Sequence, residues 1–95
     1  MNLITLSFEV AEAEQKQFIS DINTVTSFWK DQGFIVTLYR DIGNRKRFLQ
    51  MFQTDKTVDQ MVELLQNEAS AKKAFDRIKN LGSRVIVTAM EQVSE

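Results

Sequence analysis

The stretch from Gly33 to Asp55 limits the fold more than any other part of this 95-residue chain. Along residues 34–39, purely apolar side chains alternate with a mixed set, which is the pattern of a β-strand with two different faces. The faces carry Phe34, Val36 and Leu38 on one side and Ile35, Thr37 and Tyr39 on the other. Residues 41–44, Asp-Ile-Gly-Asn, predict a turn because Gly and Asn tolerate positive φ. We therefore predict a hairpin whose second strand, Arg47–Thr54, returns antiparallel to the first.

Residues 12–32 are predicted to form a long helix before this hairpin. Apolar residues recur there at helical spacing and make one stripe. The stripe consists of Phe18, Ile22, Val25 and Trp29, with Ile19 beside them. Glu12 and Glu14 lie in the first turn, where the helix dipole favours negative charge. Gly33 follows the C-cap, where a positive φ is needed.

A second helical region follows the hairpin and begins with a capping box, with Thr57 as the N-cap and Gln60 as the N3 residue. Two apolar stripes occupy this region and are out of phase with each other. The first is Val58, Met61, Val62 and Leu65, and the second is Ala71, Ala74, Phe75 and Ile78. We therefore predict a break near residues 67–70, with Ser70 as a new N-cap, and a stop at residues 80–82, Asn-Leu-Gly.

One further strand lies at each end of the chain. Residues 3–10 place Ile4, Leu6, Phe8 and Val10 on one apolar face. Residues 84–91 place Val85, Val87 and Ala89 on one face and Ile86, Thr88 and Met90 on the other. The order β-α-β-β-α-β predicts a ferredoxin-like α+β fold, with a four-stranded antiparallel sheet and helices on one face. The length predicts one domain over residues 1–95.

Composition argues against several classes of function. A hydrophobic content of 43% is that of an ordinary globular protein, and a net charge of −1 argues against a polyelectrolyte partner. The chain has no cysteine and no histidine, which removes disulfides, thiol nucleophiles and the commonest metal ligand. We therefore expect no metal site and no cofactor. Without a membrane-spanning run or a secretion signal, we expect no membrane partner and a cytoplasmic location.

The sheet face opposite the predicted core is less polar than a solvated face should be. Ile35, Tyr39, Ile86 and Met90 all lie on it, together with one side of the strand that carries Phe48 and Phe52. Because the chain has no spare helix to cover this face, a second copy of the sheet is the economical cover. We predict a homodimer; the alternative is that these are the scattered exposed apolar residues of any surface.

Four short features carry a resemblance to a known family. They are Tyr39-Arg40-Asp41, Arg47-Phe48, the aromatic Phe52 before the second helical region, and Ala71–Phe75. Over about half of the chain, they resemble the antibiotic-biosynthesis-monooxygenase-like domains. The resemblance implies a dimeric α+β barrel, in which two ferredoxin-like units join their sheets. It also implies binding of small aromatic or polyketide-like ligands or haem, or cofactor-free oxygen chemistry. Many members have a histidine in the segment that matches residues 68–75, and this sequence has none.

The resemblance suggests two groups of candidate site residues and no assigned catalytic residue. An apolar group would line a pocket between helices and sheet, although Trp29 also completes a stripe typical of core packing. A polar group would contact a ligand or stabilise an anionic intermediate, or would form a solvated hairpin end. The groups are Trp29, Tyr39 and Phe75, and Arg40, Asn44 and Arg47.

Other functions fit this sequence less closely. RNA-recognition motifs have the same element order, but of their third-strand aromatic positions, aligned from Arg45, only Phe52 is aromatic here. We therefore expect no nucleic-acid partner. Asp55 and Asp59 lie at a helix start, where capping explains them better than a metal does. The remaining alternative to ligand binding is a non-catalytic interaction or structural domain. An open pocket near Trp29 and Tyr39 would favour ligand binding, and a filled core would favour the alternative.

Overall fold

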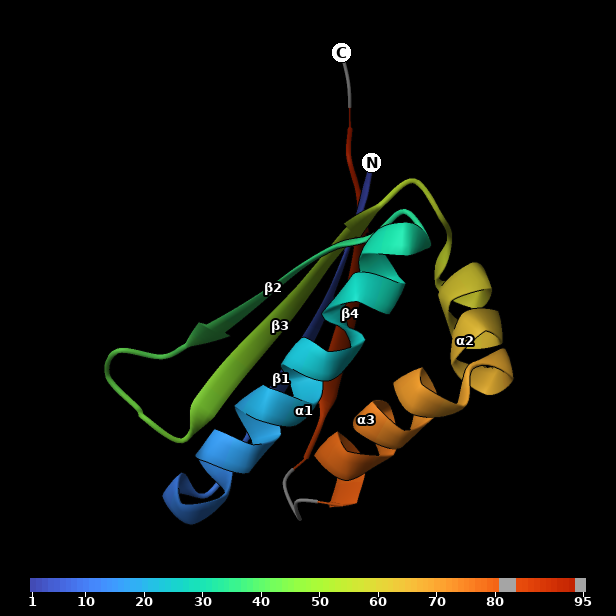
Figure 1. Cartoon of the computed structure of the whole chain (residues 1–95). Helices are drawn as coiled ribbons and strands as arrows, with labels where there is room; N and C mark the ends of the chain where they lie inside the picture. The colour runs from blue at the N-terminus through green and yellow to red at the C-terminus, as the bar shows by residue number, and fades with distance from the viewer. Residues whose placement is uncertain (81–83, 94–95) are drawn as a thin grey trace.

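The computed structural model describes residues 1–80 and 84–93. Within these residues the elements are β1 (Asn2–Glu9), α1 (Glu12–Asp31), β2 (Ile35–Arg40), β3 (Arg47–Thr54), α2 (Val58–Asn67), α3 (Ala69–Asn80) and β4 (Ile86–Glu91). The strands form one antiparallel sheet in the order β2-β3-β1-β4. The helices lie on one face of it (Figure 1). The predicted ferredoxin-like α+β fold is confirmed, and the predicted strand limits agree within two residues.

The end of α1 is a Schellman motif that turns the chain into β2. Gly33 has a φ of +88°. Its N–H donates to the carbonyl of Lys30 over 3.1 Å, and the N–H of Phe34 donates to the carbonyl of Trp29 over 2.9 Å. These two bonds satisfy carbonyls that the helix end leaves free. The predicted role of Gly33 is confirmed, and the motif brings the rings of Trp29 and Phe34 to a centroid distance of 5.1 Å.

The predicted capping box and helix break are both present. Thr57 Oγ1 accepts from the N–H of Gln60 over 3.2 Å, and Gln60 Oε1 accepts from the N–H of Thr57 over 2.8 Å. Glu68 has an extended backbone, with φ −114° and ψ 111°, and separates α2 from α3. The helical region is therefore broken at a single residue, inside the predicted range.

The N-cap predicted for α3 is wrong by two residues. Ser70 lies inside α3, which begins at Ala69. The carbonyl of Glu68 accepts from the N–H of Lys72 over 3.0 Å, so the first turn of α3 already starts from Glu68. Of the first predicted stripe, Met61 is buried, whereas Val58 and Val62 are exposed. The side chains of Ala74 and Ile78, and the stop at residues 81–82, lie outside the described residues.

Two aromatic clusters form part of the core between helices and sheet. The Phe8 cluster consists of Phe8, Phe18 and Phe48, with ring centroids 5.4–6.2 Å apart. The Trp29 cluster consists of Trp29, Phe34 and Phe52, with ring centroids 5.1–6.3 Å apart. All six rings are at most 3% exposed. β3 contributes Phe48 to one cluster and Phe52 to the other, so this strand connects the two clusters.

The opposite side of the sheet, here called the open face, carries no helix (Figure 1). Cross-strand pairing places three rows of four residues on it, and the charged pair Glu9 and Arg47 follows at one edge. The rows are Ile35, Gln53, Leu3 and Met90; Thr37, Met51, Thr5 and Thr88; and Tyr39, Leu49, Ser7 and Ile86. Exposed fractions of 57% for Ile35, 51% for Ile86 and 61% for Met90 show that its apolar residues are open to solvent. None of the described helices is both long and apolar enough to cross a membrane.

Substitution of Gly33 tests the helix end. We expect Gly33→Ala to lower the free energy of unfolding by about 1–2 kcal/mol, because alanine pays a steric cost at positive φ. A clash is not the cause, since an added Cβ would have its nearest neighbour, in Lys56, at 3.8 Å. Gly43 is the control: its φ is not positive, and Gly43→Ala should change the value by less than about 0.5 kcal/mol. Urea denaturation measures both, and equal losses would contradict the φ argument.

Candidate functional site

A small cavity lies between the helices and the sheet. Its volume is about 10 Å³, which is at the lower limit for a single water. All three helices and two strands contribute to its wall, including Trp29, Gln50, Phe52, Met61, Ala71 and Phe75. Every lining residue except Gln50 is apolar. The core is therefore nearly filled, with one polar side chain on the wall of the remaining space.

Trp29 and Phe75 lie at this cavity, as the sequence analysis grouped them. Trp29 is 3% exposed and makes edge contacts with Phe28, Phe34 and Phe52 at centroid distances of 5.1–5.3 Å. Phe75 is half-buried and packs against the core. Both residues therefore serve as core side chains and as wall of the cavity.

Tyr39 does not share this cavity, and the expected grouping of Trp29, Tyr39 and Phe75 is corrected. Tyr39 pairs with Leu49 across the sheet and is 51% exposed on the open face. Side chains alternate along a strand, so Leu38 faces the helices and Tyr39 faces away from them. The sheet itself separates the phenol from the cavity.

Arg40 is held in a polar corner at the start of α1. Its Nη1 donates to Oε1 of Gln15 over 2.9 Å, and its guanidinium lies 5.7 Å from the ring centre of Phe48. Gln15 is 7% exposed, and its Nε2 donates to the carbonyls of Val10 and Arg45 over 3.0 and 2.7 Å. The amide of Gln15 thus joins the start of α1, β2 and the hairpin loop.

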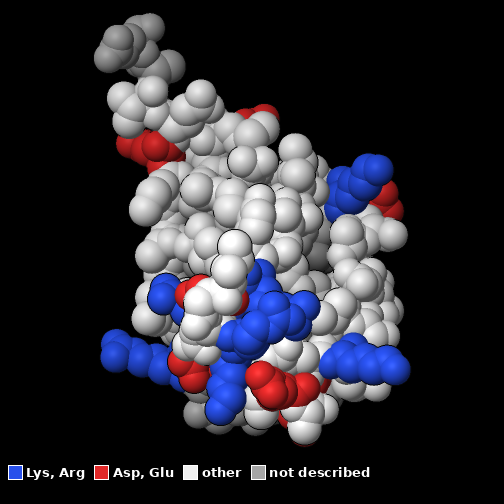
Figure 2. Space-filling model, turned by 90° about the vertical axis from the view of Figure 1, so that its left-hand side faces the viewer, with Lys and Arg blue, Asp and Glu red and all other residues white. Residues whose placement is uncertain are grey.

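Asn44 and Arg47 lie at the exposed end of the β2–β3 hairpin. Asn44 Oδ1 accepts from the N–H of Lys46 over 3.2 Å, and Asp41 Oδ1 accepts from the N–H groups of Gly43 and Asn44. Arg47 is exposed and pairs with Glu9 in the sheet register. Figure 2 looks onto this end, where basic and acidic side chains are interspersed in the lower half of the view. The polar candidates therefore do not meet the apolar candidates at one site.

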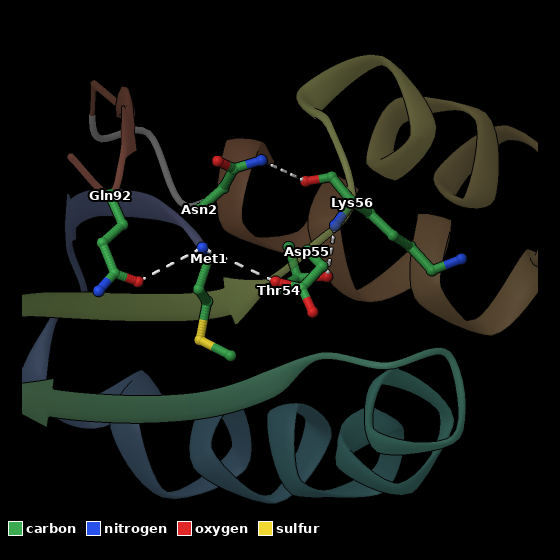
Figure 3. Close-up of polar contacts among 6 residues, drawn as sticks. All are labelled: Met1, Asn2, Thr54, Asp55, Lys56 and Gln92. Carbon is green, nitrogen blue, oxygen red and sulfur yellow. Dashed lines mark hydrogen bonds and ion pairs between the residues drawn. The ribbon is translucent and has the colours of Figure 1, made fainter. Parts of the chain in front are cut away.

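Asp55 belongs to a contact that fastens β1 to the loop after β3 (Figure 3). The amino group of Met1 lies 3.7 Å from Asp55 Oδ1 and donates to Gln92 Oε1 over 3.4 Å. Asn2 Nδ2 donates to the carbonyl of Lys56 over 2.9 Å. Among the described residues, no group of three or more acidic side chains is placed to hold a metal ion.

Gln50 is the site residue that the sequence analysis missed. The described chain buries three polar side chains, those of Gln15, Gln50 and Thr54. Gln15 makes three hydrogen bonds, and Thr54 Oγ1 accepts one from the N–H of Lys56 over 3.1 Å. Gln50 is 2% exposed, and its amide has no hydrogen-bond partner among residues 1–80 and 84–93. A buried amide without a partner costs about 1–3 kcal/mol of stability.

Periodicity would have found both buried glutamines. The strand period of two places Gln50 on the same face as Phe48 and Phe52, which were predicted to share one side of β3. The helical period places Gln15 three residues before Phe18 and therefore on the apolar stripe of α1. A polar residue inside an apolar pattern is the signal in both cases.

No protein-family model matches this sequence, and no curated protein matches it. Solved structures with the same fold do exist. A protein from Deinococcus radiodurans with the provisional name of an antibiotic biosynthesis monooxygenase aligns at a TM-score of 0.74 and 18% identity, covering 100% of this chain and 95% of that one. A similarly named protein from Nitrosomonas europaea aligns at a TM-score of 0.79 and 9% identity, covering 99% and 100%.

A third neighbour is described by its activity. SnoaB from Streptomyces nogalater, a cofactor-independent oxygenase solved as a point mutant, aligns at a TM-score of 0.76 and 17% identity, covering 99% of this chain and 94% of that one. Identities this low establish the fold. The chain therefore has the fold of antibiotic biosynthesis monooxygenase-like proteins, and the resemblance found in the sequence is confirmed at that level.

Substitution of Gln15 tests the polar corner. Gln15→Met should lower the free energy of unfolding by about 2–3 kcal/mol, because it removes three hydrogen bonds and leaves the carbonyls of Val10 and Arg45 without this donor. Gln17→Met is the control on the same helix. Gln17 is exposed and bonds only locally to Asp21, so we expect a change below about 0.5 kcal/mol. Similar urea midpoints for the two variants would contradict this account.

Proposed function

We propose that this protein binds a small, largely apolar ligand between its helices and its sheet. The observation that carries the proposal is the cavity, whose wall includes side chains of all three helices and of the sheet, among them Trp29 of α1 and Phe75 of α3. An apolar wall with few polar groups is typical of a small-molecule site. Met61 is part of the wall, and its flexible thioether adapts to different shapes at low cost.

Binding is better supported than catalysis. Cofactor-free oxygen chemistry fits the fold, because SnoaB is described as a cofactor-independent oxygenase. A general base must lie within hydrogen-bond reach of the proton that it removes. The described lining of the cavity contains no ionisable side chain, and Tyr39 lies beyond the sheet. An oxygenase reaction is therefore a more specific proposal than ligand binding, and the described lining does not supply a base for it.

One observation favours a second function, that of an interaction or structural domain with a filled core. The cavity of about 10 Å³ holds at most one water, so the wall must move before any larger molecule enters. If the wall does not move, the packing of the two aromatic clusters is the whole role of this region.

The proposal includes a homodimer formed through the open face, in the cytoplasm. Support comes from the rows of the open face, in which Leu3, Leu49 and Met51 join the exposed Ile35, Tyr39, Ile86 and Met90. No carboxylate, lysine or arginine interrupts these three rows. Joining two such faces would bury about 600–1,000 Å² per partner, the range of standard specific interfaces.

The dimer is tested by placing a charge on the open face. We expect wild type to be a dimer in light scattering at micromolar concentration. Ile86→Lys should give a monomer or an aggregate, because a lysine buried there would be desolvated without a partner. Lys16→Glu, on the exposed side of α1, should leave the dimer intact. A monodisperse wild-type monomer over this range would remove the dimer from the proposal.

The ligand site is tested with quinoline, a neutral bicyclic aromatic probe. The single tryptophan, Trp29, lies on the cavity wall, so its indole N–H signal in NMR spectra reports occupancy. We expect quinoline to shift this signal in a saturable way. Ala71→Leu should weaken binding about tenfold or more, because Ala71 is 1% exposed on the wall and a larger side chain fills the space. Lys72→Leu, at an exposed neighbouring position, should bind like wild type. A tryptophan signal that does not respond to quinoline would favour the filled-core domain.

A further inference from the structure

On the inner surface of β3, Gln50 places an amide between two aromatic rings. Along this surface the order is Phe48, Gln50, Phe52. Phe48 belongs to the Phe8 cluster and Phe52 to the Trp29 cluster, so the amide lies between the two clusters. The cavity opens at the same place, and Gln50 forms part of its wall.

Within residues 1–80 and 84–93 this amide makes no hydrogen bond. Gln50 is 2% exposed and has no hydrogen-bond partner among the described residues. Gln15, a side chain of the same type with similar burial, satisfies both ends of its amide. Buried polar groups are nearly always paired, so the exception points to a partner other than the described residues.

The chemistry of the wall restricts what that partner is. The other lining residues are apolar, so a charged group entering the cavity would have no counter-charge there. A carboxamide presents an acceptor oxygen and a donor N–H₂ side by side. A ligand satisfies both ends when it is neutral and carries a donor next to an acceptor, as a lactam does.

Building on the proposed function, we infer that Gln50 anchors the ligand by pairing its amide with an adjacent donor and acceptor on a neutral, flat molecule. The aromatic rings of Trp29 and Phe52 on the same wall suit a flat apolar body behind that polar edge. Cyclic amides and neutral molecules with a hydroxyl beside a carbonyl form this ligand class. The role of the site is then recognition of one polar edge inside an apolar pocket.

Two probes of the same bicyclic shape test this inference. Quinoline offers an acceptor alone, and 2-quinolone offers an N–H beside a carbonyl. The Trp29 indole signal gives the affinity of each probe for wild type and for Gln50→Met, which keeps the length of the side chain and removes the amide. We expect wild type to bind 2-quinolone about tenfold more tightly than quinoline, and Gln50→Met to lose this preference.

The outcomes separate the inference from the proposed function. Equal binding of the two probes by wild type, or an unchanged preference in Gln50→Met, overturns the role of Gln50 and leaves the ligand site standing. Failure of both probes to shift the Trp29 signal overturns the inference and the ligand site together. Loss of the preference in Gln50→Met with retained quinoline binding supports the inference, since the variant is then folded with its pocket intact.

Stability without ligand gives a second, independent measurement. If the amide is kept for a ligand, Gln50→Met should raise the thermal midpoint, because it removes an unsatisfied buried group. Gln15→Met should lower the midpoint, because that amide is fully bonded within the chain. A lower midpoint for Gln50→Met would show that the free protein already uses the amide, and it would overturn the inference.

Discussion

In the centre of the sheet, β1 and β3 pair so that Leu6 lies opposite Gln50 and Phe8 opposite Phe48. This register decides which side chains meet the helices and which form the open face. A slip of one residue would exchange the faces of β3, placing Leu49 and Met51 under the helices and both phenylalanines outside. The contacts of Asp41 Oδ1 shape the turn between β2 and β3, and the amide of Gln15 binds the hairpin loop to the start of α1. The core, the cavity and the open face all depend on this alignment.

Periodicity alone predicts most of the fold, because each strand and helix shows its own repeat. Short sequence patterns, local to each element, predict the order of elements. They also predict the end of α1 at Gly33 and the break before α3. The site is harder to predict, because its residues come together only through pairing and packing. Tyr39 illustrates this. Strand alternation places its side chain on the other face of the sheet from Leu38, whereas the family resemblance grouped it with Trp29. The N-cap of α3 was misplaced because Ser70 is a better capping residue than Glu68, and the geometry of the break takes precedence over that preference.

β3 connects the two apolar surfaces of the molecule. Its inner residues Phe48, Gln50 and Phe52 face the helices, and its outer residues Leu49 and Met51 face away from them. In the proposed dimer, the outer residues would be covered by a partner, while Gln50 and Phe52 on the inner side contact a ligand. One strand would then lie between the ligand and the second copy. Because packed interiors transmit strain, a contact that restricts motion on one side of the sheet would also restrict motion on the other.

The single extended residue Glu68 has a consequence for how the helical layer opens. The first N–H groups of a helix have no acceptor within that helix, and the break places the start of α3 in the middle of this layer. The ladder of α3 begins with the bond from the N–H of Lys72 to the carbonyl of Glu68, so the break lies next to Ala71 on the cavity wall. Local unfolding of α2 need not spread into α3, so amide protons of the two helices should exchange with solvent as separate blocks. The layer is thus divided into units that can open separately, with their boundary beside the cavity.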